Sequence, residues 1–359
     1  MQAFQKIELG WRRIIKMEKE IRIILLGCLC SRTVVEEQQL DNLLTEKIDW
    51  IWIVGQLLRH RLDGYFYVNT IEKKQLFVHR HINKTLKVLS DSYKDINSVN
   101  LNAIGKLFDE LSNQDICVAG LKGVVYNTTI YSLRMRRSND IDVLVAEKDL
   151  KKFYIVMRQL GFIQSLTQGE TEATKKEKLI QLMNYHDLVP YYKIDGKNRI
   201  KVDVNFQFDS KENEITEEVL NFGVCSYEKH GFAVQGLRWE THLMHLCVHF
   251  YREATNSLWT DNLADVDMYK IIDLENSFRN YSHEQLLGWI EHIHRFSVER
   301  QCYYALYYLN CFFPNDNYSE LMSLLGVGDT SFITEIYENK THSMMSRSES
   351  FVARAFAGI

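Results

Sequence analysis

Two acidic side chains separated by one residue open an apolar stretch near the middle of the chain. In residues 139–145, Asp140 and Asp142 precede a Val-Leu-Val run. Alternate residues of a β-strand point to the same face, so the two carboxylates would project together while Ile141 and the valines fill a core behind them. Carboxylate pairs of this kind bind Mg²⁺ together with substrate phosphates. The pattern therefore indicates phosphoryl chemistry in which metal ions position the attacking and leaving oxygens.

The neighbours of the acid pair support this interpretation. An Asp-x-Asp pair alone usually marks a solvated strand edge, because short motifs have many false positives. Here Lys122-Gly123 follows an expected short strand. Three arginines come just before the pair: Arg134, Arg136 and Arg137. A strand, a glycine, a basic cluster and an acid pair in this order favour a phosphate-binding site.

The composition is ordinary for a globular protein. The chain has 359 residues, of which 46% are hydrophobic and 25% charged. This length suggests two domains, or one core with helical additions. The net charge of −4 argues against a general affinity for nucleic acid, although a local basic groove is compatible with it. With 2 prolines and 17 glycines, the chain offers no long flexible linker.

The seven cysteines are scattered and form no C-x-x-C pair, which argues against a zinc ribbon or a redox motif. We expect reduced thiols and a cytoplasmic location. The apolar run 23–30 is too short to cross a bilayer, and the charged residues before it do not fit a signal peptide. We therefore expect a buried helix at this run and no membrane partner.

The two ends of the chain have the spacing of amphipathic helices. Residues 1–112 carry apolar side chains every three or four positions, including Ile51 and Leu58. The clearest helix is 97–111, ending at Ser112-Asn113. From Trp239 onward the pattern is helical again. Two helices are expected at 241–251 and 265–274, and no strong pattern follows Ser343.

Strands and helices alternate between these ends. The expected strands are 116–119, 141–145, 186–194 and 199–208, and the expected helices are 122–133 and 150–160. Asp149 can cap the second helix, and the polar stretch 167–180 is a candidate loop or lid. Asp195-Gly196 has hairpin chemistry. In the last strand Asp203 alternates with valines, so it would face away from the core, like the acid pair.

Five short elements follow one another in an order that can be compared with known families. They are Leu121-Lys122-Gly123, residues 137–145, Leu160-Gly161-Phe162, residues 201–206 and residues 243–249. Together with the helical stretch 49–64, this order resembles the uncharacterised bacterial nucleotidyltransferase family of the polymerase-β superfamily. The resemblance covers roughly residues 40–275.

The resemblance implies an α+β fold with a polymerase-β-like nucleotidyltransferase core, a small mixed sheet with two helices packed on one face. On this basis we expect a helical N-terminal region at 1–112, the core at 113–235 and a helical C-terminal region at 236–359. The implied reaction transfers a nucleoside monophosphate from a nucleoside triphosphate such as ATP to an acceptor, with release of pyrophosphate.

The resemblance also implies roles for the acidic residues. Asp140 and Asp142 would ligate Mg²⁺, and Asp203 would bind a second ion or take the acceptor proton. The sequence departs from the wider superfamily at the first strand, where Gly-Leu-Lys-Gly stands in place of Gly-Ser or Gly-Gly. Asn205 stands where many members have His, so no role of that His carries over.

The nucleotide-binding residues implied by the resemblance are Lys122, Gly123, Arg137 and Ser138. Lys122 and Arg137 would neutralise charge on the leaving pyrophosphate, with Arg134 and Arg136 as weaker candidates. Gly123 would permit close approach of backbone to phosphate. Ser138 could donate to a phosphate oxygen or cap the turn.

Three histidines, His242, His245 and His249, could share one helix face, which invites a zinc interpretation. No H-E-x-x-H pattern is present, and the helix is largely apolar. We therefore favour packing or acceptor-site roles over metal binding.

Three functions remain open on the sequence. The first is a Mg²⁺-dependent nucleotidyltransferase whose acceptor is a small molecule, a peptide or protein hydroxyl, or an RNA end. The lack of surplus positive charge weighs against RNA. The second is a non-catalytic nucleotide- or partner-binding protein on the same fold, against which the three clustered carboxylates argue. The third is a toxin-like enzyme that acts on tRNA or protein.

Overall fold

The computed structural model describes residues 18–209, 215–262, 264–265, 267–346 and 351–356. Contacts divide the chain into two units. Unit 2 is Asp91–His245, and unit 1 consists of the described residues before and after it. The boundaries fall inside two helices, α6 (Arg80–Ser112) and α11 (Trp239–Ala254). The predicted core, 113–235, lies within unit 2.

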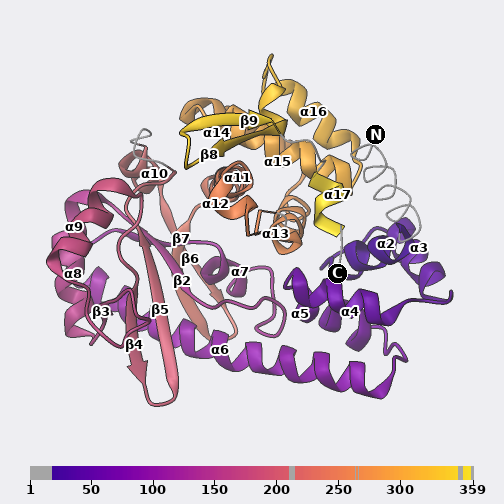
Figure 1. Cartoon of the computed structure of the whole chain (residues 1–359), viewed down its shortest axis with the longest axis horizontal. Coiled ribbons are helices and arrows are strands. Elements are labelled where there is room, and N and C mark those ends of the chain that lie inside the picture. The colour runs from indigo at the N-terminus through magenta and orange to yellow at the C-terminus, as the bar shows by residue number, and fades with distance from the viewer. Residues whose placement is uncertain (1–17, 210–214, 263, 266, 347–350, 357–359) are drawn as a thin grey trace. The chain divides into compact units, whose positions relative to one another are not determined.

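Unit 2 contains a mixed sheet of seven strands (Figure 1). The strands are β1 Val118–Gly120, β2 Ile141–Val145, β3 Ile163–Gln164, β4 Tyr191–Asp195, β5 Asn198–Asn205, β6 Val224–Lys229 and β7 Phe232–Leu237. Their order across the sheet is β3-β4-β5-β2-β1-β7-β6. The β2–β5 and β1–β7 pairs are parallel and the others antiparallel. The site strands β2 and β5 therefore lie side by side near the middle of the sheet.

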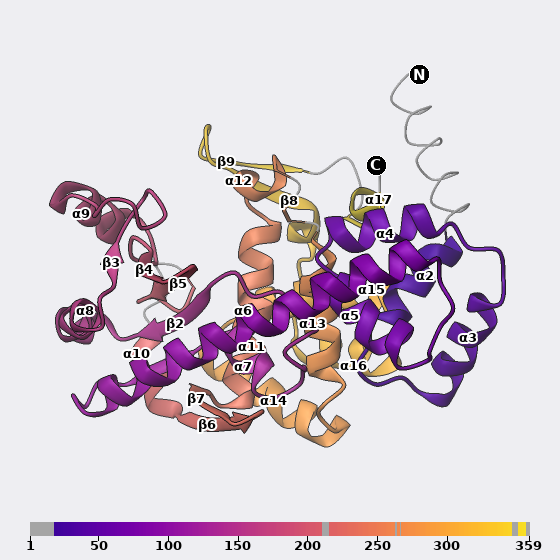
Figure 2. The same cartoon turned by 90° about the horizontal axis from the view of Figure 1, so that it is seen from below.

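Two helices cover one face of this sheet. The C-terminal part of the long helix α6 lies against it (Figures 1 and 2), and α8 packs on the same face. Leu101 and Ile104 of α6, Phe153 of α8 and Val143 of β2 belong to one buried cluster. The other helical elements of unit 2 are α7 Gly123–Asn127, the 3₁₀ turn Glu147–Asp149, α8 Leu150–Gln159, α9 Lys175–Asn184 and α10 Thr216–Phe222.

The sequence explains this layer. Val143, Val202 and Val204 occupy alternate strand positions and are at most 1% exposed, so their faces of β2 and β5 are apolar. The β4–β5 hairpin turns through Gly196 and Lys197, between the paired residues Asp195 and Asn198. Gly196 has φ +58°, a conformation that glycine adopts without steric cost.

Unit 1 is mostly helical. It contains α2 Glu18–Gly27, α3 Val34–Leu44, α4 Trp50–Arg59, α5 Asp63–Phe66, a π-helical turn Tyr67–Glu72, α12 Ser257–Thr260, α13 Met268–Phe278, α14 His283–Phe296, α15 Glu299–Phe312, α16 Asp316–Leu324, a 3₁₀ turn Ser331–Thr334, the hairpin β8 Glu335–Glu338 and β9 Ser343–Ser346, and α17 Phe351–Phe356. Polar contacts tie its two chain segments together. The Tyr65 hydroxyl donates to Asp273 at 2.7 Å, and Arg279 pairs with Glu36 at 2.7 Å.

No disulfide bond joins any of the seven cysteines, all of which lie in the described ranges. Of the described helices, none combines the length and apolar character that crossing a bilayer requires.

Several sequence predictions are confirmed. The described part of 1–112 is helical apart from its connecting turns, and α6 ends at Ser112 as predicted. The strand at the acid pair has the predicted bounds, 141–145. The run 23–30 is helical only to Gly27, where α2 ends, but its apolar side chains are buried. The predicted helix at 1–17 lies outside the described residues.

Other predictions were wrong in detail. The stripe predicted in α4 was partly wrong, because Ile51 is 85% and Leu58 45% exposed. Leu57, which also belonged to the stripe, is buried, and so is Ile53, which the stripe left out. The helix expected at 122–133 is only the five-residue α7. Asp149 occupies the N-cap position of α8 but makes no side-chain capping hydrogen bond.

The candidate lid at 167–180 is partly helical. Helix α9 begins at Lys175, and Thr174 and Glu177 form a capping box that satisfies its first backbone N–H groups. This Thr-x-x-Glu pattern was a signal that the sequence reading missed.

Strand and helix bounds differ elsewhere. The strand expected at 186–194 is β4, 191–195, and the helix expected at 265–274 is α13, 268–278. Strands β3 and β6 to β9 were missed. β6 is an edge strand whose residues are only partly buried, so its apolar alternation is weak.

Candidate active site

The acid pair lies where the alternation of β2 predicts. Ile141, Val143 and Val145 point into the core with at most 1% exposure. Asp142 points to the opposite face of the sheet and is mostly buried, and Asp140 immediately precedes the strand on the same side. The strand therefore supplies the core with one face and the candidate site with the other.

The third carboxylate lies on the neighbouring strand. Strands β2 and β5 are parallel, and their register pairs Asp142 with Asp203 and Val143 with Val204. Paired residues of adjacent strands point to the same face, about 5 Å apart. The register thus brings together two carboxylates that are far apart in the sequence.

Lys122 reaches the acid pair from the end of β1. Its Nζ lies 3.0 Å from Oδ1 of Asp142, and both side chains are mostly buried. The Lys122 backbone has φ +46° and ψ −114°, a conformation that turns normally give to glycine. A non-glycine residue held there stores on the order of 1–3 kcal/mol of strain, which is typical of functional sites.

A second lysine contacts the other two carboxylates. Nζ of Lys201 lies 2.6 Å from Oδ2 of Asp203 and 3.5 Å from Oδ2 of Asp140. The two ammonium groups therefore neutralise part of the charge that three neighbouring carboxylates create.

Burial dominates the electrostatics of the paired carboxyls. It raises the pKa of Asp203 to about 7, and the negative charge of Asp142 adds to that rise against the opposing Lys201. Burial also raises the pKa of Asp142, and the Lys122 ammonium opposes this rise. Both carboxyls would therefore gain from an added cation that stabilises their ionised forms.

The donor set suits Mg²⁺. Three carboxylates from two adjacent strands are hard oxygen ligands of the type this ion prefers. Oδ1 of Asp203 is buried without a hydrogen-bond partner, so it has an unused acceptor. As the side chains stand, no group of three or more His, Cys, Asp or Glu in the described ranges is arranged to enclose an ion. Lys122 and Lys201 instead occupy carboxylate oxygens that an ion would need.

Gly123 is required by close packing of the loop before β2. A Cβ at this position would lie 2.6 Å from Nη1 of Arg136 and 2.6 Å from Oγ of Ser138. Nη1 of Arg136 donates to that hydroxyl at 3.2 Å, and Nδ2 of Asn127 donates to it at 3.3 Å. The predicted nucleotide-binding residues Gly123 and Ser138 therefore contact each other, with Arg136 buried between them and the ring of Tyr126.

Two asparagines of α6, which the sequence reading did not select, hold this loop. Nδ2 of Asn97 donates to the carbonyls of Leu133 and Arg136, both at 2.8 Å, and Nδ2 of Asn100 donates to the Ser138 carbonyl at 3.2 Å. Both asparagines are buried. Both asparagines fall on the apolar stripe of α6. A polar residue on a face that packs into the core could therefore have identified them from the sequence.

The remaining arginines separate by environment. Arg137, the stronger candidate from the sequence, is exposed, and its Nε donates to Asn139 at 2.8 Å. Arg134 pairs with Asp91 at 2.9 Å. Arg136, considered weaker, is buried, and its positive charge opposes the rise in the pKa of Asp142 that burial causes. Arg136 therefore supplies the arginine charge that Asp142 experiences.

The histidines of unit 2 on α11 pack against aromatic rings. His242 contacts Tyr126 at 5.4 Å and His245 contacts Phe208 at 5.2 Å between ring centroids, both edge-on. Burial lowers the pKa of His242 to about 3, so the ring is neutral at pH 7. Of the two roles expected from the sequence, packing and an acceptor site, these contacts fit packing. Asn205, at the end of β5, donates to the Val143 carbonyl at 3.3 Å.

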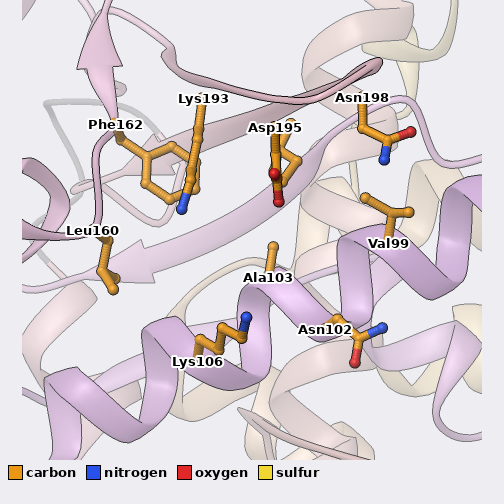
Figure 3. A pocket seen from close by; sticks show the side chains of 10 residues that line it. Val99, Asn102, Ala103, Lys106, Leu160, Phe162, Lys193, Asp195 and Asn198 are labelled. Atoms are coloured by element: carbon orange, nitrogen blue, oxygen red, sulfur yellow. The ribbon is translucent and has the colours of Figure 1, made fainter.

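A separate pocket of about 200 Å³ opens on the sheet face that α6 covers. Figure 3 shows Lys106 of α6 with Lys193 and Asp195 of the β4–β5 hairpin along its walls. None of the predicted site residues lines it, because their side chains lie on the other face of β2 and β5 or in the loops that lead to them.

The family comparison agrees with the order of motifs. Residues 46–314 match the family model described as an uncharacterised nucleotidyltransferase. The match spans well over half of the chain, so the chain belongs to this nucleotidyltransferase family. No curated protein matches the sequence.

Proposed function

We propose that the protein is a Mg²⁺-dependent nucleotidyltransferase that transfers a nucleoside monophosphate from a nucleoside triphosphate to an acceptor hydroxyl or phosphate. The acceptor oxygen attacks the α-phosphorus, the bond to the bridging oxygen breaks, and pyrophosphate leaves. Family membership supports the class of reaction. A mixed sheet with α6 and α8 on one face supports the polymerase-β-like core that the sequence resemblance implies.

The register of Asp142 and Asp203 is the observation that carries this proposal. A solvated strand face would not need two mostly buried carboxylates side by side, since each costs free energy to ionise there. Asp140 completes the cluster through its shared contact with Lys201. The cost is offset when cations bind, as in metal-dependent phosphoryl transfer.

Each residue has a role in this proposal. Asp140, Asp142 and Asp203 would hold two Mg²⁺ ions, which supply positive charge to the reacting phosphate and to the attacking and leaving oxygens. Alternatively, Asp203 would take the acceptor proton instead of holding an ion, a role that its pKa of about 7 without metal would suit. Lys122 would bind the triphosphate, with Gly123 and Ser138 shaping the loop beside it.

Two arginines would supply further positive charge to the bound nucleotide. Arg137 is exposed and could contact phosphate directly, whereas Arg136 acts from a buried position. Both would stabilise negative charge as pyrophosphate leaves.

The test measures Mg²⁺-dependent binding of each nucleoside triphosphate and release of pyrophosphate. Wild type is compared with the double variant Asp140→Ala/Asp142→Ala, and with Asp109→Ala, which removes an exposed carboxylate of α6, as the control. We expect the double variant to lose at least about 100-fold in turnover and the control to keep it. If folded wild type binds no triphosphate with Mg²⁺, a partner-binding role on this fold replaces the proposal.

A further inference from the structure

Lys201 stands in a position that the reaction itself does not require. It lies on β5 two residues before Asp203, so both side chains project from the same sheet face. Its ammonium is within 2.6 Å of Asp203 and 3.5 Å of Asp140. One lysine therefore contacts a carboxylate on each of the two strand segments that make up the acid cluster.

The two lysines of the site contact different carboxylates. Lys122 approaches from the β1 side and contacts Asp142, whereas Lys201 approaches from β5, whose other neighbour is β4. The cross-strand partner of Lys201 on β4 is Tyr192. In the proposed reaction Lys122 belongs to the nucleotide side, which leaves Lys201 on the opposite side of the acid cluster.

We infer that Lys201 is an internal counter-ion that divalent metal must displace from Asp140 and Asp203, and that it thereby sets the affinity of the site for metal. This inference rests on the proposed function. An ammonium and a divalent ion compete for the same carboxylate oxygens, because each needs direct contact with them. The lysine also offsets carboxylate repulsion in the protein without metal.

The lysine side chain is suited to leave these oxygens. Lysine carries a compact, strongly hydrated charge on a flexible four-carbon stem. The Lys201 side chain is 28% exposed, so its ammonium has a route into solvent.

The experiment measures Mn²⁺ binding to the full chain by calorimetry and by the spin-resonance signal of unbound Mn²⁺. Lys201→Gln removes the charge, and Lys193→Gln removes a lysine from β4 that lies at the pocket on the other sheet face. We expect Lys201→Gln to bind Mn²⁺ about tenfold more tightly than wild type, and Lys193→Gln to match wild type.

Thermal unfolding gives a second readout. Without metal, Lys201→Gln should melt below wild type, and saturating Mn²⁺ should raise its melting temperature by more than it raises that of wild type. If Lys201→Gln does not fold without metal, Lys201→Met is used instead. A neutral variant that folds only after Mn²⁺ is added supports the inference. Variants that stay unfolded with Mn²⁺ overturn it.

Failure of this inference is distinguishable from failure of the proposed function. Equal or weaker Mn²⁺ binding by a folded neutral variant overturns the role of Lys201 and leaves the metal site in place. Absence of Mn²⁺ binding to both wild type and the variant overturns the inference together with the proposed metal chemistry.

Discussion

Lys122 pairs with Asp142 at 3.0 Å while its own backbone is held at φ +46° and ψ −114°. The residue that pairs with Asp142 is thus also a residue whose backbone conformation is strained. Its position is fixed on both sides, because the Leu121 N–H donates to the Asp142 carbonyl at 2.9 Å and the Tyr126 N–H donates to the Lys122 carbonyl at 2.9 Å.

Substitution of Lys122 separates the charge from the strain. Lys122→Ala loses the ion pair and keeps the strain, whereas Lys122→Gly loses the ion pair and relieves the strain. We expect the glycine variant to have a free energy of unfolding about 1–2 kcal/mol higher than the alanine variant, measured by urea denaturation. An alanine variant as stable as the glycine variant would show that no strain is stored at this position.

The pH dependence of stability should report the environment of Asp203. Because its pKa is raised to about 7 in the folded protein, the folded state holds more protons than the unfolded state between about pH 4 and about pH 7. Its contribution to stability therefore falls as pH rises through this window.

Asp203→Asn removes that titration. In chelator, the melting temperature of wild type relative to Asp203→Asn should fall as pH rises from about 4 to about 7 and then level off. At the acid end the two proteins should converge, because a protonated aspartate and an asparagine are similar in shape and charge. A constant difference across the window would contradict a raised pKa.

Gly123→Ala should disturb the packing beside the site. The added Cβ would approach Arg136 and Ser138 to 2.6 Å, so the arginine or the loop must move. We expect a loss of about 1–3 kcal/mol in the free energy of unfolding and weaker triphosphate binding. Gly105→Ala in α6 is the matched control, since its Cβ meets no atom within 4 Å and should stabilise the helix by about 0.5–1 kcal/mol. Equal effects of the two substitutions would refute the packing role of Gly123.

Asn97→Ala should loosen the loop that carries Arg136 and Ser138. It removes the donor of two 2.8 Å hydrogen bonds and leaves the Leu133 and Arg136 carbonyls without it. We expect a loss of about 1–3 kcal/mol, measured by denaturant unfolding. Asn102→Ala, on the exposed face of the same helix, should stay within about 0.5 kcal/mol of wild type. A neutral Asn97→Ala would mean that solvent replaces both hydrogen bonds.

The sequence was sufficient to predict the strand at 141–145 and the side to which Asp203 projects. Both predictions depend on strict alternation of apolar and polar residues, which the pleat of a strand converts directly into two faces. The helix ending at Ser112 was predictable for a similar reason, because its apolar stripe is regular and ends at a polar dipeptide.

Other parts of the site depend on tertiary contacts that no local pattern contains. The β2–β5 register and the bridge made by Lys201 involve residues about sixty positions apart. The positive φ of Lys122 was unexpected because glycine is the usual residue in that conformation. Arg136 and Arg137 are adjacent in the sequence, and only the fold decides which of them is buried.

The shared register of β2 and β5 has a consequence for how this chain can tolerate insertions. Side chains alternate with a period of two, so one residue added between Ile141 and Asp142, with Ile141 kept in the core, would turn Asp142 into the core and Val143 out of it. Stability and the carboxylate cluster would then fail together. Insertions at the hairpin tip near Gly196, where a Cβ meets no atom within 4 Å, leave both strand faces unchanged. Proteins with an insertion at that turn should therefore still fold and keep the carboxylate cluster, whereas proteins with an insertion in the strand should not.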